Sequence, residues 1–494
     1  MTNENGNASA SFAHAVCVPF PWQSHVKALM NLAELLLDRG FFITFVNTEW
    51  MEERLWRASQ DVRRHKFRFL SFPDGLPPEH GRLSQLGEFI VALQKSGPAL
   101  ERALRTAGGS GISIVDVPPV TCIVTDSFMS STHTVAKNLG VPRVVFWPFC
   151  ATSSVAFKYS YELQSQGHIP VKVSEAQSRG NLITDLPGNI PPLRPTDLLA
   201  AFREKNKFDL LFSAILYECK VQNKDTDYVL VNTFEELEGK DAAAALSVNG
   251  CPALSIGPVF LPNFLQGKES NSSMDMCEED ETCLQWLDAQ KQGSVLYVSF
   301  GSSAMKSQEQ LEELALGLEN GGQPFLWVLR SYLLGGGPAI LPEGFKERTG
   351  DRGFLVNWAP QMKVLNHVSV GGFLTHCGWN STLESISMGV PIIGWPFNGD
   401  QFLDCRFAKE VWKVGIDFED VDVNDKRLLR RDEVENAVRR LMQTCEGEEL
   451  RKRALDLKQA ATKSVMRGGS SFTNMNNFVE DMENIVKSRV LHLK

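Results

Sequence analysis

Hydrophobic and polar residues follow two different periods along the first half of the chain. Short runs rich in β-branched and aromatic residues predict strands, and between them apolar residues recur every three or four positions, which is typical of helices. The predicted strands cover residues 14–20, 41–46, 66–71, 121–125, 143–147 and 227–231, and the predicted helices cover 26–39, 131–139 and 235–246. Strands that alternate with helices predict a parallel sheet with helices on both faces.

A change in composition divides the chain at about residues 257–281, where proline, glycine and a run of acidic residues interrupt the periodicity. Such a stretch is typical of a linker between domains. The alternation then restarts, with predicted strands at 294–300, 324–329, 353–356, 372–375 and 391–394, a helix at 308–319, and helices from 431 to the end. We therefore predict an α/β protein with two doubly wound domains. Residues 167–195, rich in proline and glycine, are predicted to form a long functional loop.

Composition and charge exclude several classes of function. The 494 residues include 50 basic and 59 acidic side chains, which gives a net charge of −9, and 43% of the residues are hydrophobic. An acidic globular protein of this kind is a poor partner for nucleic acid or anionic lipid. The ten cysteines form no C-x-x-C pair, and no apolar run reaches the roughly 18–20 residues that span a bilayer. Because the first residues also lack the apolar core of a secretory signal, we expect a cytoplasmic monomer without a membrane anchor.

The residues with the most informative chemistry lie at 358–401. The strand predicted before His376 runs directly into a glycine and then a helix. A strand-to-helix turn of this kind directs free N–H groups and the positive end of the helix dipole at one point, where a phosphate can bind. Asn380 and Ser381 can add donors there, and His376 can meet a second phosphate. Glu384 lies on the same helical face, from which its carboxylate can accept both hydroxyls of a ribose.

Each of these features alone has a structural explanation. An Asn-Ser pair is typical of a helix cap, a single histidine is usually structural, and a glutamate on a helix is usually solvated. Their combination in one short stretch favours a site for a nucleotide diphosphate. Such a site needs no metal ion if the helix dipole and the neighbouring donors balance the charge of the diphosphate.

This stretch resembles the signature of the plant UDP-glycosyltransferases. The matching residues are Trp358-Ala359-Pro360-Gln361, His376-Cys377-Gly378-Trp379-Asn380-Ser381, Glu384, Gly389-Val390-Pro391, Trp395-Pro396 and Asp400-Gln401. The resemblance covers the first half more loosely and implies the GT-B fold, in which two Rossmann-like domains face a central cleft. It divides the chain into an acceptor-binding domain (1–256), a linker (257–282), a UDP-sugar-binding domain (283–470) and a C-terminal helix (471–494) that packs back on the first domain.

The resemblance also implies a role for each residue of the donor site. Trp358 is expected to stack on uracil, the Ala359 backbone to pair with the edge of that ring, and Gln361 and Glu384 to hold the ribose. The terminal glutamine of the signature favours glucose over galactose, whereas the Asn-Gly pair at 398–399, in place of the commoner aromatic-Ala pair, loosens the sugar pocket slightly. The remaining donor residues are expected to hold the diphosphate (Ser302, His376, Asn380 and Ser381) or the sugar hydroxyls (Trp379, Asp400 and Gln401).

Two histidines near the first predicted strand are candidates for the base that such a transferase needs. A neutral histidine, with an ordinary pKa of about 6.5, suits proton abstraction at cytosolic pH. His14 opens the strand, which favours a structural or surface role, whereas His25 follows it, where open α/β sheets bind ligands. His25 also matches the catalytic base of the family's Pro-x-x-Gly-His segment. Ser24 replaces the glycine of that segment, and Lys27-Ala28 stands where many members have Asn-Pro.

Asp126 follows the predicted strand at 121–125, a position that is by itself typical of a helix cap. The resemblance instead makes Asp126 the acid that fixes the tautomer of His25 and stabilises its protonated form.

An apolar acceptor pocket is expected beside these residues. Aromatic residues next to strands belong to the core more often than to a pocket, but such a pocket suits a flat hydrophobic acceptor such as a flavonoid, another phenolic or a terpenoid. The candidates for its lining are Phe20, Trp22, Phe128, Trp147, Phe149 and the loop at 187–195.

The leading hypothesis is an inverting enzyme that transfers glucose from UDP-glucose to a hydroxyl of a small lipophilic acceptor, without a cofactor or metal ion. The products would be a β-glucoside and UDP. Two alternatives stay open, namely C-glycosylation of a phenolic ring by the same site and a non-catalytic protein that binds nucleotide sugars. A nicotinamide oxidoreductase is disfavoured because the chain contains no G-x-G-x-x-G motif.

Overall fold

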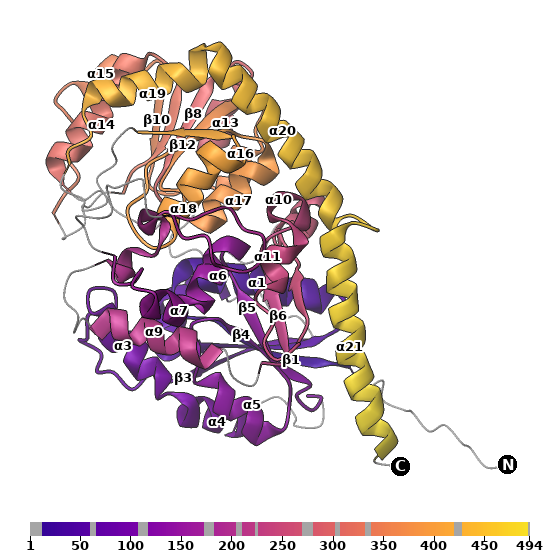
Figure 1. Cartoon of the computed structure of the whole chain (residues 1–494). Helices are drawn as coiled ribbons and strands as arrows, with labels where there is room; N and C mark the ends of the chain where they lie inside the picture. The colour runs from indigo at the N-terminus through magenta and orange to yellow at the C-terminus, as the bar shows by residue number, and fades with distance from the viewer. Residues whose placement is uncertain are drawn as a thin grey trace.

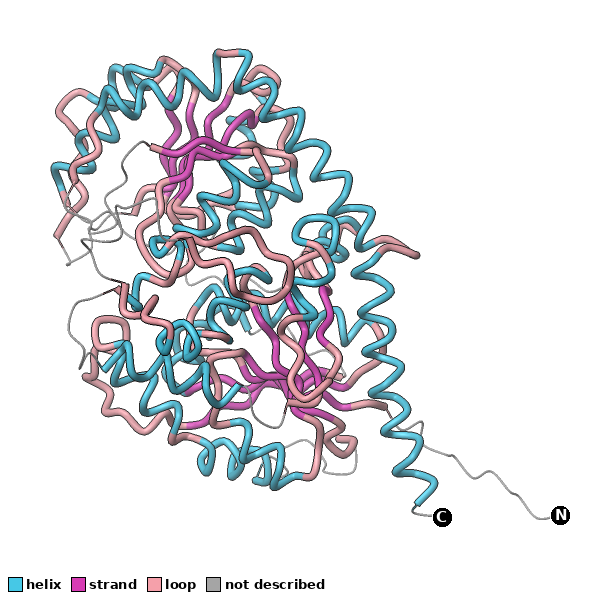
Figure 2. The backbone as a smooth tube through the Cα atoms, in the orientation of Figure 1, coloured by secondary structure: helices cyan, strands magenta, loops and turns pink. Residues whose placement is uncertain are grey.

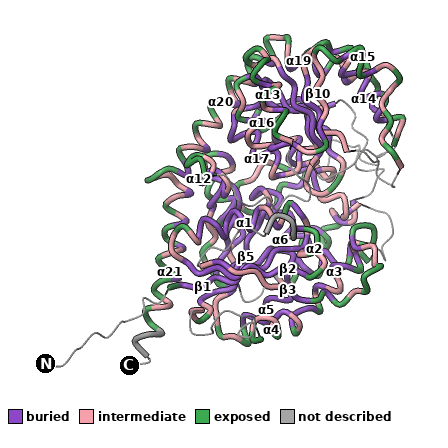
Figure 3. Tube along the Cα trace, turned by 180° about the vertical axis from the view of Figure 1, so that it is seen from behind, coloured by how far each residue is buried: buried purple, intermediate pink, exposed green. Residues whose placement is uncertain are grey.

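Two parallel β-sheets, each enclosed by helices, account for most of the computed structural model (Figure 1 and Figure 2). The model describes residues 12–59, 66–106, 117–171, 182–203, 210–222, 226–268, 280–301, 307–330, 337–418 and 427–492. Strands lie inside and helices outside in both halves, and the buried residues follow the strands (Figure 3). Because helices cover both faces of each sheet, the strands are apolar on both sides, which explains why they appear in the sequence as short continuous apolar runs.

The first sheet has seven parallel strands in the order β3-β2-β1-β4-β5-β6-β7. The strand order reverses between β1 and β4, and open α/β sheets bind ligands at the carboxyl ends of strands at such a point. The strands are β1 (His14–Val18), β2 (Phe42–Thr48), β3 (Phe67–Phe72), β4 (Cys122–Asp126), β5 (Arg143–Trp147), β6 (Tyr228–Val231) and β7 (Ala253–Ser255).

The second sheet has six parallel strands in the order β10-β9-β8-β11-β12-β13, with the reversal between β8 and β11. Its strands are β8 (Val295–Ser299), β9 (Phe325–Val328), β10 (Gly353–Val356), β11 (Val370–Thr375), β12 (Ile392–Gly394) and β13 (Gly415–Asp417). Every predicted strand is present. The sequence analysis did not predict β7 and β13, which have three residues each.

The helices of the first domain follow its strands in sequence. They are α1 (Gln23–Asp38), α2 (Glu49–Ser59), α3 (Leu86–Gln94), α4 (Gly97–Thr106), α5 (Thr132–Leu139), α6 (Ala151–Lys158), α7 (Ser160–Ser165), α9 (Leu210–Gln222), α10 (Glu235–Glu238), α11 (Lys240–Ala244) and α12 (Leu261–Leu265), with 3₁₀ turns at Pro195–Asp197 and Ala200–Phe202. The prediction of one helix over 235–246 is wrong, because Gly239 has a φ of +80° that separates α10 from α11. The segment predicted as a linker between the domains contains the short helix α12.

The helices of the second domain include the one that carries the signature residues. They are α13 (Thr282–Asp288), α14 (Gln308–Gly321), α15 (Phe345–Thr349), α16 (Gln361–Leu365), α17 (Trp379–Met388), α18 (Gln401–Arg406), α19 (Arg431–Gln443), α20 (Cys445–Val465) and α21 (Ser470–His492), with a π-helical turn at Phe407–Val411. None of the described helices is long and apolar enough to cross a membrane.

The last two helices connect the domains from the outside. In Figure 1, α20 runs down the second domain and α21 continues along the first. Gly468, with a φ of +87°, makes the turn between them. Met475 and Phe478 of α21 are buried in the apolar core beneath the first sheet, and Asn474 donates a hydrogen bond to the Ser255 carbonyl at 3.0 Å. The end of the chain therefore completes the core of the domain where the chain began.

Candidate active site

A cavity of about 350 Å³ lies between the two domains, at the carboxyl ends of both sheets. Helix α17 of the second domain lies next to α1 of the first in Figure 1 and Figure 3, which view the molecule from opposite sides. Most of the side chains predicted for the site line this cavity. They are Phe20, Trp22, His25, Phe128, Phe149, Trp358, Ala359, Gln361, His376, Trp379, Asn380, Ser381, Glu384, Asp400 and Gln401.

The structure places three of the predicted residues or segments elsewhere. Trp147 is 3% exposed and packs against Phe157 in the core, with ring centroids 6.2 Å apart, so it supports the cavity wall without forming part of it. The loop at 187–195 does not line the cavity either. Asp126 is fully buried behind His25. Ser302 lies outside the described residues.

His25 and Asp126 meet at the reversal point of the first sheet. His25 lies in the first turn of α1, just after β1, and Asp126 ends β4, the neighbouring strand. The Nδ1 atom of His25 is 2.8 Å from Oδ2 of Asp126, while Oδ1 of Asp126 accepts a hydrogen bond from the Phe128 N–H at 2.9 Å. A buried carboxylate at Nδ1 favours the tautomer that carries its proton there, so Nε2 is left as the basic nitrogen.

His14 is structural rather than catalytic. It is fully buried in β1, with Nδ1 2.7 Å from the Pro118 carbonyl and Nε2 2.7 Å from Oγ1 of Thr44. Burial lowers the pKa of His14 to about 4. Both ring nitrogens are therefore engaged, and the structural reading of this residue holds.

The second domain directs the amino end of α17 at the cavity. Strand β11 ends at Thr375 and is followed by His376 and by Cys377, which has a φ of +60°. This left-handed conformation is uncommon for a residue other than glycine and turns the chain sharply into the helix. The N-cap residue of α17 is Gly378, which has no side chain to cap the helix, and a helix leaves its first N–H groups without partners inside the helix. Together with the helix dipole, these groups favour an anion at this end of the cavity.

Two glycines make room for the ring of His376 beside this helix end. A Cβ atom on Gly301 would lie 2.8 Å from Cε1 of the ring, and one on Gly378 would lie 2.7 Å from Nε2. Burial lowers the pKa of His376 to about 4. The ring is therefore neutral at neutral pH, where it can form a hydrogen bond with a ligand without adding positive charge.

Two signature side chains of α17 connect the domains. The indole N–H of Trp379 donates to the carbonyl of Asn232 at 2.8 Å, and the amide of Asn380 donates to the carbonyl of Ser24 at 2.8 Å. Trp379 lines the cavity, but its single side-chain donor is engaged by the first domain, which leaves the backbone as its means of binding a sugar. Local sequence could not predict this contact, because Asn232 and Trp379 are 147 positions apart.

A hydrogen-bond network holds the carboxylate of Glu384. Gln361 donates to Oε2 of Glu384 at 2.7 Å and to the Ser381 hydroxyl at 3.1 Å, and it accepts a hydrogen bond from the Tyr297 hydroxyl at 3.2 Å. Glu384 is 3% exposed, and the ammonium group of Lys27 from the first domain lies 3.6 Å from its Oε1. The carboxylate is thus fixed in direction at the cavity wall.

Trp358 lines the cavity and lies three positions before Gln361. The guanidinium of Arg330 lies 5.1 Å from the centroid of its ring. An aromatic ring in this position can stack on a planar base, and the guanidinium on it restricts its orientation.

The turn before α18 carries Asp400 and Gln401. The side-chain oxygen of Gln401 accepts hydrogen bonds from the N–H groups of Phe397 and Asn398 at 2.8 and 2.9 Å, which leaves its amide NH₂ for a ligand. Oδ2 of Asp400 has no hydrogen-bond partner within the described parts of the chain. Burial raises the pKa of Asp400 to about 6, although the nearby His25 lowers it. The Oδ2 atom of Asp400 as acceptor and the amide NH₂ group of Gln401 as donor can together bind the hydroxyls of a sugar.

Aromatic rings surround His25 on the side of the first domain. The centroids of Phe20 and Phe149 each lie 5.2 Å from that of His25, and Phe128 lies 6.0 Å away. Sequence reasoning missed the apolar residues that complete this wall. They are Leu86 and Ile90 of α3, Leu211 and Ile215 of α9, and Phe157, Leu199 and Ala201. The spacing of four residues in α3 and in α9 was a readable signal, although it also fits an ordinary core helix.

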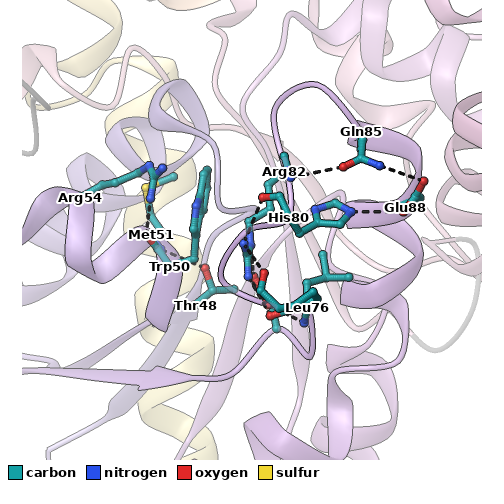
Figure 4. A network of polar contacts seen from close by, with 12 residues as sticks. Thr48, Trp50, Met51, Arg54, Leu76, His80, Arg82, Gln85 and Glu88 are labelled. Carbon is teal, nitrogen blue, oxygen red and sulfur yellow. Dashed lines mark hydrogen bonds and ion pairs between the residues drawn. The ribbon is translucent and has the colours of Figure 1, made fainter.

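A network of polar contacts fixes the segment that precedes α3 (Figure 4). The guanidinium of Arg82 donates to both carboxylate oxygens of Asp74, at 2.7 and 3.0 Å, and to the carbonyl of Leu76 at 3.0 Å. Both charged side chains are 4% exposed. Trp50 packs on Phe89 of α3, with ring centroids 5.5 Å apart. The network therefore holds α3, and with it Leu86 and Ile90, in place at the cavity wall.

Replacing Arg82 by alanine is expected to destabilise the protein by about 3–5 kcal/mol, because it leaves the Asp74 carboxylate buried without its counter-ion. Thermal or chemical denaturation measures this loss. The matched control is Arg105→Ala, which breaks a surface pair with Glu101 and should cost at most about 1 kcal/mol. Equal losses in the two variants would contradict this structural role for Arg82.

Comparison with known proteins agrees with this geometry. A family model described as UDP-glucoronosyl and UDP-glucosyl transferase matches residues 115–450. The chain is 37% identical to the 7-deoxyloganetin glucosyltransferase of Catharanthus roseus, over 97% of each chain. It is 36% identical to the (R)-mandelonitrile beta-glucosyltransferase of Prunus dulcis, over 96% of this chain and 97% of the relative.

Solved structures show the same architecture. Phytolacca americana UGT2, complexed with UDP-2fluoro-glucose and pterostilbene, superposes with a TM-score of 0.77 at 30% sequence identity, over 95% of this chain and 100% of that chain. Sequence and fold are thus shared over almost the whole length of the chain. The chain therefore belongs to the UDP-glycosyltransferase family, and it is a glycosyltransferase with the two-domain GT-B fold.

Proposed function

We propose that this enzyme transfers glucose from UDP-glucose to a hydroxyl of a small lipophilic acceptor, with inversion to a β-glucoside. The observation that carries the proposal is the His25–Asp126 pair, 2.8 Å apart, in a cavity whose opposite wall is the amino end of α17. A base at one side of a cavity and an anion-binding helix end at the other is the arrangement that a direct displacement requires. The aromatic wall around His25 supports an apolar acceptor.

In the proposed donor complex, the uracil stacks on Trp358 and pairs with the Ala359 backbone, and Glu384 and Gln361 bind the ribose. The first N–H groups of α17, with His376, Asn380 and Ser381, bind the diphosphate. Asp400 and Gln401 bind the sugar hydroxyls. The proposed reaction needs no metal ion, because the helix end supplies the positive field that the leaving diphosphate needs.

In the proposed reaction, Nε2 of His25 removes the proton of the acceptor hydroxyl as its oxygen attacks the anomeric carbon. The bond from that carbon to the diphosphate breaks on the opposite face, and UDP leaves with the electron pair. Asp126 stabilises the imidazolium that forms and holds the ring in its tautomer. A single displacement of this kind converts an α-linked donor into a β-linked product.

The test is an assay of the purified protein with UDP-glucose and a panel of lipophilic alcohols and phenols, read by product mass. The panel should contain 7-deoxyloganetin, (R)-mandelonitrile and pterostilbene, because relatives of this chain are named for them or were solved with them. One added hexose and stoichiometric UDP support the proposal, and the anomeric proton coupling identifies the β product. A product that resists acid hydrolysis would indicate C-glycosylation, and UDP-glucose binding without turnover on any acceptor would indicate a non-catalytic binder.

Burial raises the pKa of Asp400 to about 6. We therefore expect the affinity for the sugar part of the donor to fall as the pH decreases below about 6. Only the ionised carboxylate is a full acceptor for a sugar hydroxyl, so protonation at lower pH weakens binding. Calorimetry at pH 5 and pH 8 should show that the ratio of UDP-glucose to UDP affinity drops in the wild type and stays constant in Asp400→Asn. UDP serves as the internal control, because groups that act on the nucleotide affect both ligands.

A further inference from the structure

Lys27 stands out among the residues that line the cavity. It is the one lysine or arginine in the described lining, which otherwise includes the acids Glu384 and Asp400 and the neutral ring of His376. A nucleotide diphosphate carries two or three negative charges into this space. Apart from the helix end, the described lining therefore offers a single permanent positive charge to balance them.

The position of Lys27 follows from two contacts between the first two turns of α1 and those of α17. Ser24 accepts a hydrogen bond from Asn380 at 2.8 Å, and Lys27 lies 3.6 Å from Glu384. Ser24 and Lys27 are three positions apart and so lie on one face of α1. Asn380 and Glu384 are four positions apart and so lie on one face of α17. These two faces therefore oppose each other. Lys27 thus lies one helical turn along α17 from the end at which the diphosphate is expected.

We propose that Lys27 is a donor-binding residue that leaves its contact with Glu384 and moves to the diphosphate of the nucleotide when the nucleotide binds. The proposal rests on the proposed function, since it concerns the same donor. One turn of an α-helix rises about 5.4 Å, a distance that the flexible four-carbon stem of a lysine can span by changing rotamers. The lysine side chain is 33% exposed, so the cavity leaves it freedom to move.

The move has a chemical consequence at each of its ends. At the diphosphate, the ammonium group stabilises the negative charge that grows on the leaving oxygen as the bond to the sugar breaks. At Glu384, its departure leaves the carboxylate free to accept the ribose hydroxyls. The pair that Lys27 forms with Glu384 in this structure compensates the charge of a carboxylate that is 3% exposed.

The proposal is tested by measuring the affinities of UDP and uridine, which differ only in the diphosphate, for the wild type, Lys27→Met and Lys27→Arg. In Lys27→Met we expect UDP to bind about tenfold more weakly and uridine to bind within twofold of the wild type, since a charged contact is lost only with UDP. Lys27→Arg should restore most of the UDP affinity. The UDP preference of the wild type should also decrease as salt increases.

Several outcomes would overturn the proposal. If UDP and uridine lose affinity by the same factor, Lys27 only holds the two domains together, and if neither changes, it has no role in donor binding. An arginine variant as weak as the methionine variant would exclude a role of charge.

Lys27→Gln gives a second neutral variant whose thermal unfolding shows whether the fold is intact. Lys363→Met, which removes a lysine paired with Glu281 outside the cavity, should leave both affinities unchanged. A wild type that binds no UDP would instead contradict the proposed function.

Discussion

The His25→Ala variant is expected to lose roughly 10²–10⁴-fold in kcat while it binds UDP as tightly as the wild type. His25 is the lining residue whose imidazole is oriented by a buried carboxylate, and its ring is enclosed by Phe20, Phe128 and Phe149. Alanine removes the proposed base and leaves intact the opposite wall of the cavity, to which we assign donor binding. Steady-state kinetics with the best acceptor of the panel and calorimetry with UDP measure the two quantities separately.

The matched control for this variant is His367→Ala. His367 also contacts a carboxylate, Asp288, at 3.1 Å, but the pair lies outside the cavity. We expect its kcat to remain within about twofold of the wild type, a difference of about 0.4 kcal/mol in barrier. A His25→Ala variant that retains more than a tenth of the wild-type kcat would contradict the assignment of His25 as the base.

The second large effect is expected from Asp126→Asn, which should lower kcat by roughly 10²–10⁴-fold with UDP affinity unchanged. Asparagine keeps the oxygen that accepts the Phe128 N–H at 2.9 Å and replaces the one 2.8 Å from Nδ1 of His25 by an NH₂ group. The NH₂ group of asparagine donates to Nδ1 and so favours the His25 tautomer with its proton on Nε2. Nε2 then has no lone pair with which to take the proton from the hydroxyl of the substrate. Kinetics and UDP calorimetry measure the effect.

This variant separates a catalytic from a capping role. A cap needs only the oxygen that asparagine retains, so an active Asp126→Asn enzyme with wild-type stability would reduce Asp126 to a structural residue. Asp126→Ala removes both oxygens and should lower kcat far more than UDP affinity, whereas equal losses of both would contradict its role beside His25. Asp288→Asn provides the matched control in the other His–Asp pair.

Periodicity predicted every strand longer than three residues, but it did not predict some long helices, such as α2, α4 and α9. Strands with apolar residues on both faces, such as β1 and β4, are short continuous apolar runs bounded by polar residues. Elements of three residues, such as β7, carry no period, and the break at Gly239 depends on a backbone angle that glycine permits without requiring it. The domain boundaries given for the chain remain predictions.

The candidate site divides in the same way. Residues 376–384 are contiguous on one strand-to-helix turn, so local sequence reveals which side chains share a face. The apolar wall near His25 comes from α3, α9 and loops that are distant from one another in sequence. In a helix, an apolar stripe that lines a pocket has the same sequence pattern as an apolar stripe that packs into a core. For this reason Trp147 was a reasonable candidate although it packs in the core, and Leu86 and Ile215 were missed.

The amino-acid sequence by itself determined the two α/β halves, the helix that begins at Trp379, and the residue types able to bind a nucleotide, since these depend on neighbours along the chain. Only the tertiary structure decided that Asp126 contacts His25, 101 positions away, and that Lys27 faces Glu384. The first contact arises at the strand reversal of one sheet, and the second arises where the carboxyl ends of two separate sheets face each other. Both depend on how distant strands and domains pack, which a local pattern of residues does not encode.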